Sequence, residues 1–136
     1  MTCKAECVNP AFITRVWPLV AELVQKSVDT CGDCDVKEFE DGLHDGSMLL
    51  WLATDGQEIK AIVITELTQS PKLGRVCRMR LGAGHDMADW FSLKDDIEAY
   101  AREEKCLRVR IEGRAGWAKM FSDYRQPYVI LEKILD

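Results

Sequence analysis

The last third of the sequence constrains the fold more than any other part. An amphipathic helical pattern ends at 101–104, and a short strand pattern follows at 106–111. After a glycine-containing stretch at 113–117 come a second short helical pattern and a final strand pattern at 128–135. A strand that is joined to the next through a packed helix forms a βαβ unit, which places the two strands in parallel. We therefore expect an α/β fold with parallel pairing near its C-terminal end.

Composition sets limits on the class of protein. A chain of 136 residues that is 47% hydrophobic and 30% charged is expected to form one domain, spanning 1–136. No apolar run approaches the roughly 20 residues needed to cross a bilayer. The start of the chain, 1–7, has no apolar signal region, so we expect a cytoplasmic protein with no membrane partner. A formal net charge of -5 disfavours nucleic acid as a partner.

Periodicity and turn residues predict the other elements. They are strands at 3–8, 47–54, 57–68 and 75–81, and helices at 17–29, 35–43 and 87–104. Pro18 suits the first turn of its helix, and Asp35 with Glu38 forms a pattern like a capping box. Asp55-Gly56 predicts a two-residue hairpin turn, and 82–86 is expected to end the fourth strand. The resulting order, β-α-α-β-β-β-α-β-α-β, predicts a mixed central sheet with helices on both faces.

Four of the six cysteines lie near the N-terminus or in one loop: Cys3, Cys7, Cys31 and Cys34. Four thiolates are a possible zinc ligand set. Cys31 and Cys34 also form a C-x-x-C pair, but they follow a helix, whereas a redox pair of this type opens a helix after a strand. Unligated thiols are the favoured interpretation, so no metal site is expected; zinc and redox roles remain alternatives.

Several segments carry a resemblance to a known family. They are 48–52, Trp90, 97–101, the Gly-Arg-x-Gly-Trp segment at 113–117, and 131–135. Together with the order of elements, they resemble the GNAT family of N-acetyltransferases over nearly the whole chain. The likeness is closer to short GNAT-like proteins of tailed phages and prophages. It implies a GNAT-like α/β fold.

The resemblance also implies acetyl-CoA as the ligand of a loop before the third helix, whose backbone N–H groups would hold the pyrophosphate. The corresponding positions here are Leu81, Gly82, Ala83 and Gly84. This loop is longer than the family pattern. In addition, Asp86 and Asp89 stand at the start of the helix, where they would repel the pyrophosphate. The sequence therefore predicts weak binding of acetyl-CoA, and acetyl-CoA is expected only if the protein is catalytic.

Two residues are catalytic candidates by resemblance. The family places a tyrosine general acid four residues before a Gly-Phe-like pair. Asp123-Tyr124 stands at that pair and Lys119 four residues earlier, so Tyr124 is the candidate, with packing at the helix end as the favoured alternative. Glu66 is the carboxylate best placed to act as general base toward an amine. An ion-pair or solvent-exposed role for Glu66 is the favoured alternative.

Four arginines alternate to one side of two strands that are neighbours in this fold: Arg78, Arg80, Arg108 and Arg110. If they converge, they form a face for a phosphate or carboxylate partner. Internal pairing with Glu66, Glu112 or Glu132 is an equally weighted alternative.

Two functional hypotheses remain. The altered loop and the displaced tyrosine favour a phage-type GNAT-like protein without strong acetyl-CoA chemistry. Such a protein would bind another protein, of phage or host, or form part of the virion. The alternative is a divergent acetyl-CoA-dependent N-acetyltransferase with an unidentified amine acceptor. Because one fold hosts many functions, the fold does not choose between them.

Overall fold

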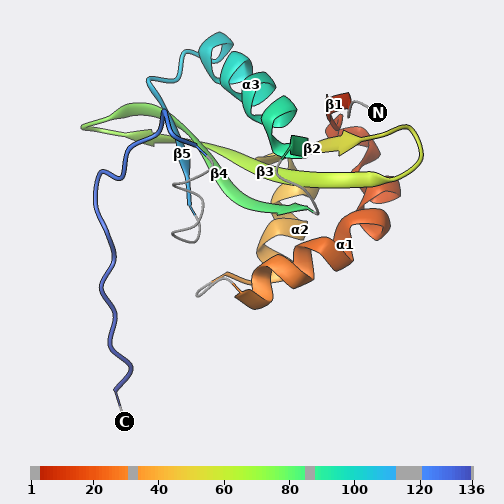
Figure 1. The fold of residues 1–136 in the computed structure, drawn as a ribbon, viewed down its shortest axis with the longest axis horizontal. Coiled ribbons are helices and arrows are strands. Elements are labelled where there is room, and N and C mark those ends of the chain that lie inside the picture. The colour runs from red at the N-terminus through yellow and green to blue at the C-terminus, as the bar shows by residue number, and fades with distance from the viewer. Residues whose placement is uncertain (1–3, 31–33, 85–87, 113–120, 136) are drawn as a thin grey trace.

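A computed structural model describes residues 4–30, 34–84, 88–112 and 121–135. Its elements, in chain order, are β1 (Lys4–Cys7), a short 3-10 helix (Pro10–Phe12), α1 (Ile13–Thr30), α2 (Val36–Asp45), β2 (Met48–Thr54), β3 (Ile59–Ser70), β4 (Gly74–Gly84), α3 (Ala88–Glu103) and β5 (Arg108–Ile111). Within the described chain these strands form a single sheet in the order β1-β2-β3-β4-β5 (Figure 1). The predicted mixed α/β fold is confirmed.

Of the parallel pairs expected near the C-terminal end, the one between β4 and β5 is formed, whereas the one between 106–111 and 128–135 is not. The first four strands pair antiparallel, whereas β4 and β5 are parallel and are connected through α3. The end of α3 is closed by a hydrogen bond from the Cys106 N–H to the Ala101 carbonyl, with Lys105 at a positive φ of 61°. Because of this closure β5 begins at Arg108, two residues after the start of the strand predicted at 106–111.

The sheet separates two cores. Helices α1 and α2 cover one face and α3 covers the other (Figure 1). Ile62 and Ile64 of β3 face the α1/α2 side, and Val63 between them faces the α3 side, because side chains alternate along a strand. The prediction that this strand is covered on both faces is confirmed. None of the described helices has both the length and the apolar character that crossing a membrane requires.

Helix α1 starts earlier than predicted. Asn9 accepts a hydrogen bond from the Ala11 N–H, and Pro10 opens the 3-10 helix that leads into α1 at Ile13. Pro18 therefore lies inside α1 and not in its first turn. A proline there removes one backbone hydrogen bond, but burial of Val20 and Val24 holds the helix in place.

The first hairpin has a longer turn than predicted. Residues 55–58 connect β2 to β3, and the Asp55 side chain accepts hydrogen bonds from the N–H groups of Gln57 and Glu58. The Asp55 N–H in turn donates to the Glu58 carbonyl. An aspartate that bonds to the backbone ahead of it forms a turn of its own, so the loop holds four residues and not two.

The glycines after Leu81 do not end β4, contrary to the prediction. The strand continues to Gly84, and 82–84 pairs with 61–63 of β3. The register shifts between Ile64 and Thr65, whose partners are Leu81 and Met79, so Arg80 has no partner across β3. An extra residue of this kind is a β-bulge, which bends its strand.

The final strand predicted at 128–135 is not formed. This segment has neither helix nor strand structure, and it leaves the sheet (Figure 1). A strand needs neighbouring backbone groups to pair with, and this segment begins beside β5 at Tyr128 but pairs with no strand of the described chain. The helix expected before it, including Lys119, falls largely outside the described residues.

Candidate functional site at the divergence of β4 and β5

Strand β4 extends beyond its parallel neighbour. The two strands pair from Val76 with Arg108 to Met79 with Ile111. Strand β5 ends there, whereas β4 continues to Gly84. On its other side this part of β4 pairs with β3. Within the described chain, 80–84 therefore has one side with no strand neighbour, and backbone groups on such an edge are available to an extended ligand.

The residues that the family resemblance assigned to acetyl-CoA all lie in this part of β4. Leu81 is buried, and Ala83 packs against the core on the α1/α2 side. A side chain at Gly84 would place its Cβ 2.8 Å from the Cβ of Ala61. The Gly82 carbonyl accepts a hydrogen bond from the Ser27 hydroxyl of α1 at 3.3 Å. The side chains of Leu81 and Ala83, and the lack of one at Gly84, are thus explained by packing. A ligand at these positions would contact their backbone groups.

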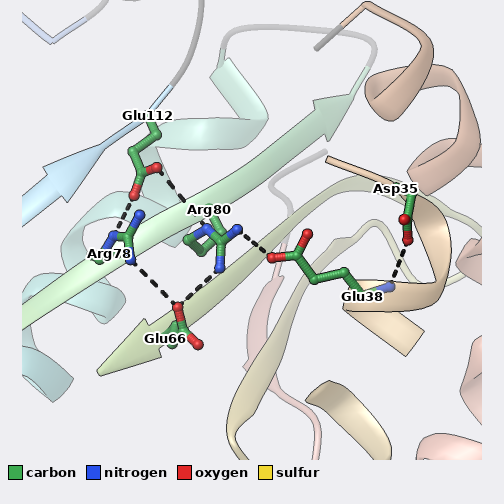
Figure 2. Close-up of polar contacts among 6 residues, drawn as sticks. All are labelled: Asp35, Glu38, Glu66, Arg78, Arg80 and Glu112. Atoms are coloured by element: carbon green, nitrogen blue, oxygen red, sulfur yellow. Dashed lines mark hydrogen bonds and ion pairs between the residues drawn. The ribbon is translucent and has the colours of Figure 1, made fainter. Parts of the chain in front are cut away.

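Arg80, the bulged residue, is the centre of a polar cluster shown in Figure 2. Its side chain is only 15% exposed. One terminal nitrogen lies 2.9 Å from Glu66 Oε1 on β3, and the other lies 2.6 Å from Glu38 Oε1 on α2. The guanidinium also lies 5.6 Å from the centre of the Phe39 ring. Arg80 thus connects the sheet to α2.

Arg78 and Glu112 complete this cluster. A terminal nitrogen of Arg78 lies 3.7 Å from Glu66 Oε1, and Arg78 Nε donates a hydrogen bond to Glu112 (Figure 2). Glu112 also lies 4.0 Å from Arg80, and its N–H donates to the Met79 carbonyl at 3.2 Å. Arg80 and Glu112 are therefore the first residues beyond the last β4–β5 pair. The cluster, with one carboxylate in excess, stands where the strands part.

The electrostatics of the cluster keep Arg80 charged. Burial disfavours the charge, but the hydrogen bonds to Glu38 and Glu66 outweigh it and raise the pKa of the Arg80 guanidinium. Glu66 Oε1 faces both Arg78 and Arg80. The geometry is that of an ion-pair partner, in which Glu66 holds two guanidiniums in position.

The other two arginines of the predicted face do not join this cluster within the described residues. Arg108 is exposed. Arg110, the register partner of Arg78, lies with its guanidinium 5.8 Å from the centre of the Tyr128 ring. The structure therefore brings together Arg78 and Arg80 only, and pairs them with carboxylates of the same chain.

Tyr124 lies on the opposite face of the sheet from Glu66. Its hydroxyl donates a hydrogen bond to Glu98 of α3 at 2.7 Å, and Lys94 lies 5.6 Å from its ring centre. Burial, followed by the hydrogen bond to Glu98, raises the pKa of the Tyr124 hydroxyl. Glu66, by contrast, is linked through Arg80 to α2. The two catalytic candidates therefore do not share one site.

Sequence reasoning missed the role of Glu38. The predicted cap is present, because Asp35 accepts a hydrogen bond from the Glu38 N–H at 3.0 Å. The Glu38 carboxylate, however, extends across to Arg80, which is 42 residues away in the sequence. No local pattern marks such a contact. Glu98 was also missed as a partner of Tyr124, which is 26 residues away in the sequence.

The cysteines give no new support to a metal site. Cys3 and Cys31 lie outside the described residues. Elsewhere in the chain, the described residues contain no group of three or more potential metal ligands. Unligated thiols stay a prediction.

Comparison with known proteins identifies the fold. No family model and no curated protein matches this sequence. A solved structure described as a probable acetyltransferase matches with a TM-score of 0.73 and 15% identity, covering 98% of this chain and 97% of that one. A ribosomal-protein-alanine N-acetyltransferase from Brucella melitensis biovar Abortus 2308 matches with a TM-score of 0.70 and 13% identity, covering 100% and 99%.

A third structure contains a ligand. It is a predicted acetyltransferase with acetyl-CoA from Clostridium acetobutylicum, with a TM-score of 0.64 and 12% identity, covering 98% of this chain and 94% of that one. At such low identities the likeness shows the fold, which is the GNAT fold expected from the resemblance. The finer likeness to phage proteins finds no support in these structures.

Proposed function

We propose that this chain is an acetyl-CoA-dependent N-acetyltransferase with an amine acceptor. The observation that carries the proposal is the edge of β4 at 80–84, which continues past the end of β5 with no strand neighbour in the described chain. The matching structures support it, since all three named above are described as acetyltransferases and one contains acetyl-CoA. This is the second of the two hypotheses drawn from the sequence.

The β4 edge suits the donor for a physical reason. Backbone N–H and C=O groups need hydrogen-bond partners, and an extended peptide can supply them by adding to a strand edge. The pantetheine arm of acetyl-CoA is likewise extended and carries amide groups. We assign it to the side of 80–84 that faces away from β3. Backbone N–H groups there would also stabilise the negative charge that develops on the thioester oxygen.

The polar cluster would receive the acceptor. Glu38 and Glu112 are 39% and 41% exposed and stand where the strands part, so their charge attracts a cationic amine. In the transfer, the amine nitrogen bonds to the acetyl carbon and the carbon–sulfur bond breaks. The cationic amine loses one proton to solvent before it attacks and a second as the amide forms, and the CoA thiolate takes up one proton. Glu66 is the positioning residue, since it holds Arg78 and Arg80.

Calorimetric titration tests binding of the donor. We expect saturable binding of acetyl-CoA with a dissociation constant below ~100 μM, which corresponds to about −5.5 kcal/mol. Adenosine 3′,5′-bisphosphate, which lacks the pantetheine arm, should bind at least ~10-fold more weakly, a difference of about 1.4 kcal/mol. Absence of saturable acetyl-CoA binding would support the weak binding that Asp86 and Asp89 predict, and it would overturn the proposal.

An assay of CoA thiol release over a panel of primary amines tests the transfer. Arg80→Ala should lower kcat/KM for any active amine, because it releases Glu38 and Glu66 together. Arg108→Ala is the matched control: Arg108 is an exposed arginine outside the cluster, and its loss should leave kcat/KM unchanged. Equal effects of the two substitutions would contradict the role assigned to the cluster.

A further inference from the structure

The C-terminal segment at 128–135, here called the C-terminal arm, is the largest exposed apolar feature of the described chain. Six of its side chains are between 64% and 91% exposed: Tyr128, Val129, Ile130, Leu131, Ile134 and Leu135. Contiguous apolar surface of this kind is rare on a monomer and marks an interaction site. The arm therefore needs a partner.

The residues of the arm are those of a strand. Tyrosine, valine and isoleucine favour strands, and the arm contains neither glycine nor proline. Its unbroken apolar run at 128–131 is typical of a strand that is covered on both faces, whereas a strand with one wet face alternates apolar and polar residues. The arm thus suits a position inside a sheet and not on a surface.

An open sheet edge is present in the same chain. Strand β5 is the last in the sheet order, and within the described residues it pairs only with β4. Its Val109 and Ile111 side chains pack against the core on the α3 side. The backbone groups on its outer side are a template for a further strand.

The arm starts beside this edge and then leaves it. Tyr128 is placed next to β5 by the Arg110 guanidinium, 5.8 Å from its ring centre. From there the chain runs away from the sheet (Figure 1). Pro127 restricts Gln126 to extended conformations, which disfavours a tight turn back at that residue. At ~3.3 Å per residue the arm spans about 26 Å, enough to cross to another molecule.

We propose that the C-terminal arm adds a strand to the β5 edge of a second copy of this chain, whose own arm adds to β5 of the first. Because each arm begins beside its own β5, a two-fold axis near Tyr128 brings each arm over the other copy's edge. Such an exchange is self-complementary and closes as a dimer. It covers both arms and both open edges, and it is independent of acetyl transfer.

Size-exclusion chromatography with light scattering on the full chain tests the proposal. The wild type should be a dimer at tens of micromolar. Ile130→Lys combined with Leu131→Lys should be monomeric, because two charges cannot enter a covered strand. Leu19→Lys changes a 68% exposed leucine on α1 and should stay dimeric. Leu131→Pro keeps the apolar character but removes a strand N–H, and it should raise the dimer dissociation constant at least ~10-fold.

Hydrogen exchange on the wild type separates the other outcomes and does not depend on how the variants fold. We expect the amides of 129–135 and of β5 to be protected in the dimer and to lose protection on dilution. A monomer with a protected arm would mean that the arm folds onto its own β5. A monomer with an unprotected arm would mean that a different partner covers it. Either result overturns the proposal, and so does a dimer that persists in the double lysine variant.

Discussion

A terminal nitrogen of Arg80 on β4 lies 2.9 Å from Glu66 Oε1 on β3, at the bulge where β4 begins to extend beyond the end of β5. The two side chains are only 15% and 22% exposed. Glu66→Gln should therefore lower the free energy of unfolding by about 1–3 kcal/mol, since it leaves a largely buried guanidinium with less compensation. Urea denaturation at neutral pH measures the loss.

The chain offers a control for this substitution. Glu58 also pairs with a cation, Lys60, but its side chain is 65% exposed. Exposed ion pairs contribute little, so Glu58→Gln should leave the urea midpoint unchanged. If both substitutions shift the midpoint equally, the Arg80–Glu66 pair does not hold the bulge together.

Tyr124 should contribute to stability and not act as the proton donor of the reaction. Its hydroxyl donates to Glu98 at 2.7 Å on the α3 face, away from the Arg80 cluster. Tyr124→Phe should lower the free energy of unfolding by about 1.5–3 kcal/mol, the range for a hydrogen bond to a charged group. The kcat of acetyl transfer should stay within ~3-fold, less than general acid catalysis contributes. A loss of kcat of two orders of magnitude would restore the catalytic assignment.

The pKa of Tyr124 gives this contribution a pH dependence. Burial and the hydrogen bond to Glu98 raise the pKa of the folded-state hydroxyl above its ordinary value, which is about 10. Folding therefore favours the neutral phenol. The stability is fully present below pH ~10 and is lost as the pH rises above it. Urea midpoints measured from about pH 8 to about pH 11 should fall more steeply with pH for the wild type than for Tyr124→Phe.

Gly84 should be required by the sheet whether or not a ligand binds. A Cβ at this position would lie 2.8 Å from the Ala61 Cβ and 3.0 Å from the Lys60 carbonyl oxygen. Gly84→Ala should thus destabilise the fold by about 1–3 kcal/mol, the usual cost of overpacking, in thermal melts without acetyl-CoA. A variant that melts like the wild type but no longer binds acetyl-CoA would show that the glycine serves the ligand.

Local patterns were sufficient for most of the elements. Apolar runs predicted β2 and β3, the Asp35 cap marked the start of α2, and the helical stripe of α3 predicted the parallel β4–β5 pair. Each of these signals is contained within one element or its connection, so it can be read from neighbouring residues.

The errors concern features that depend on distant parts of the chain. The glycines at 82 and 84 disfavour a strand locally, yet β3 lies so close to Gly84 that a side chain does not fit there. The pairing of Glu38 with Arg80 joins two elements far apart in sequence. The strand predicted at 128–135 does not form, because residues that favour strands form one only where another strand pairs with them.

The most direct test of the account is the position of acetyl-CoA on β4. Backbone amide NMR spectra recorded during an acetyl-CoA titration report which residues meet the ligand. The account predicts that the largest shifts occur at 80–84, including Gly82 and Gly84, while the exposed turn around Gly56 stays unchanged. No shift at 80–84, or shifts confined to Arg108 and Arg110 on β5, would contradict the assignment of this strand edge to the donor.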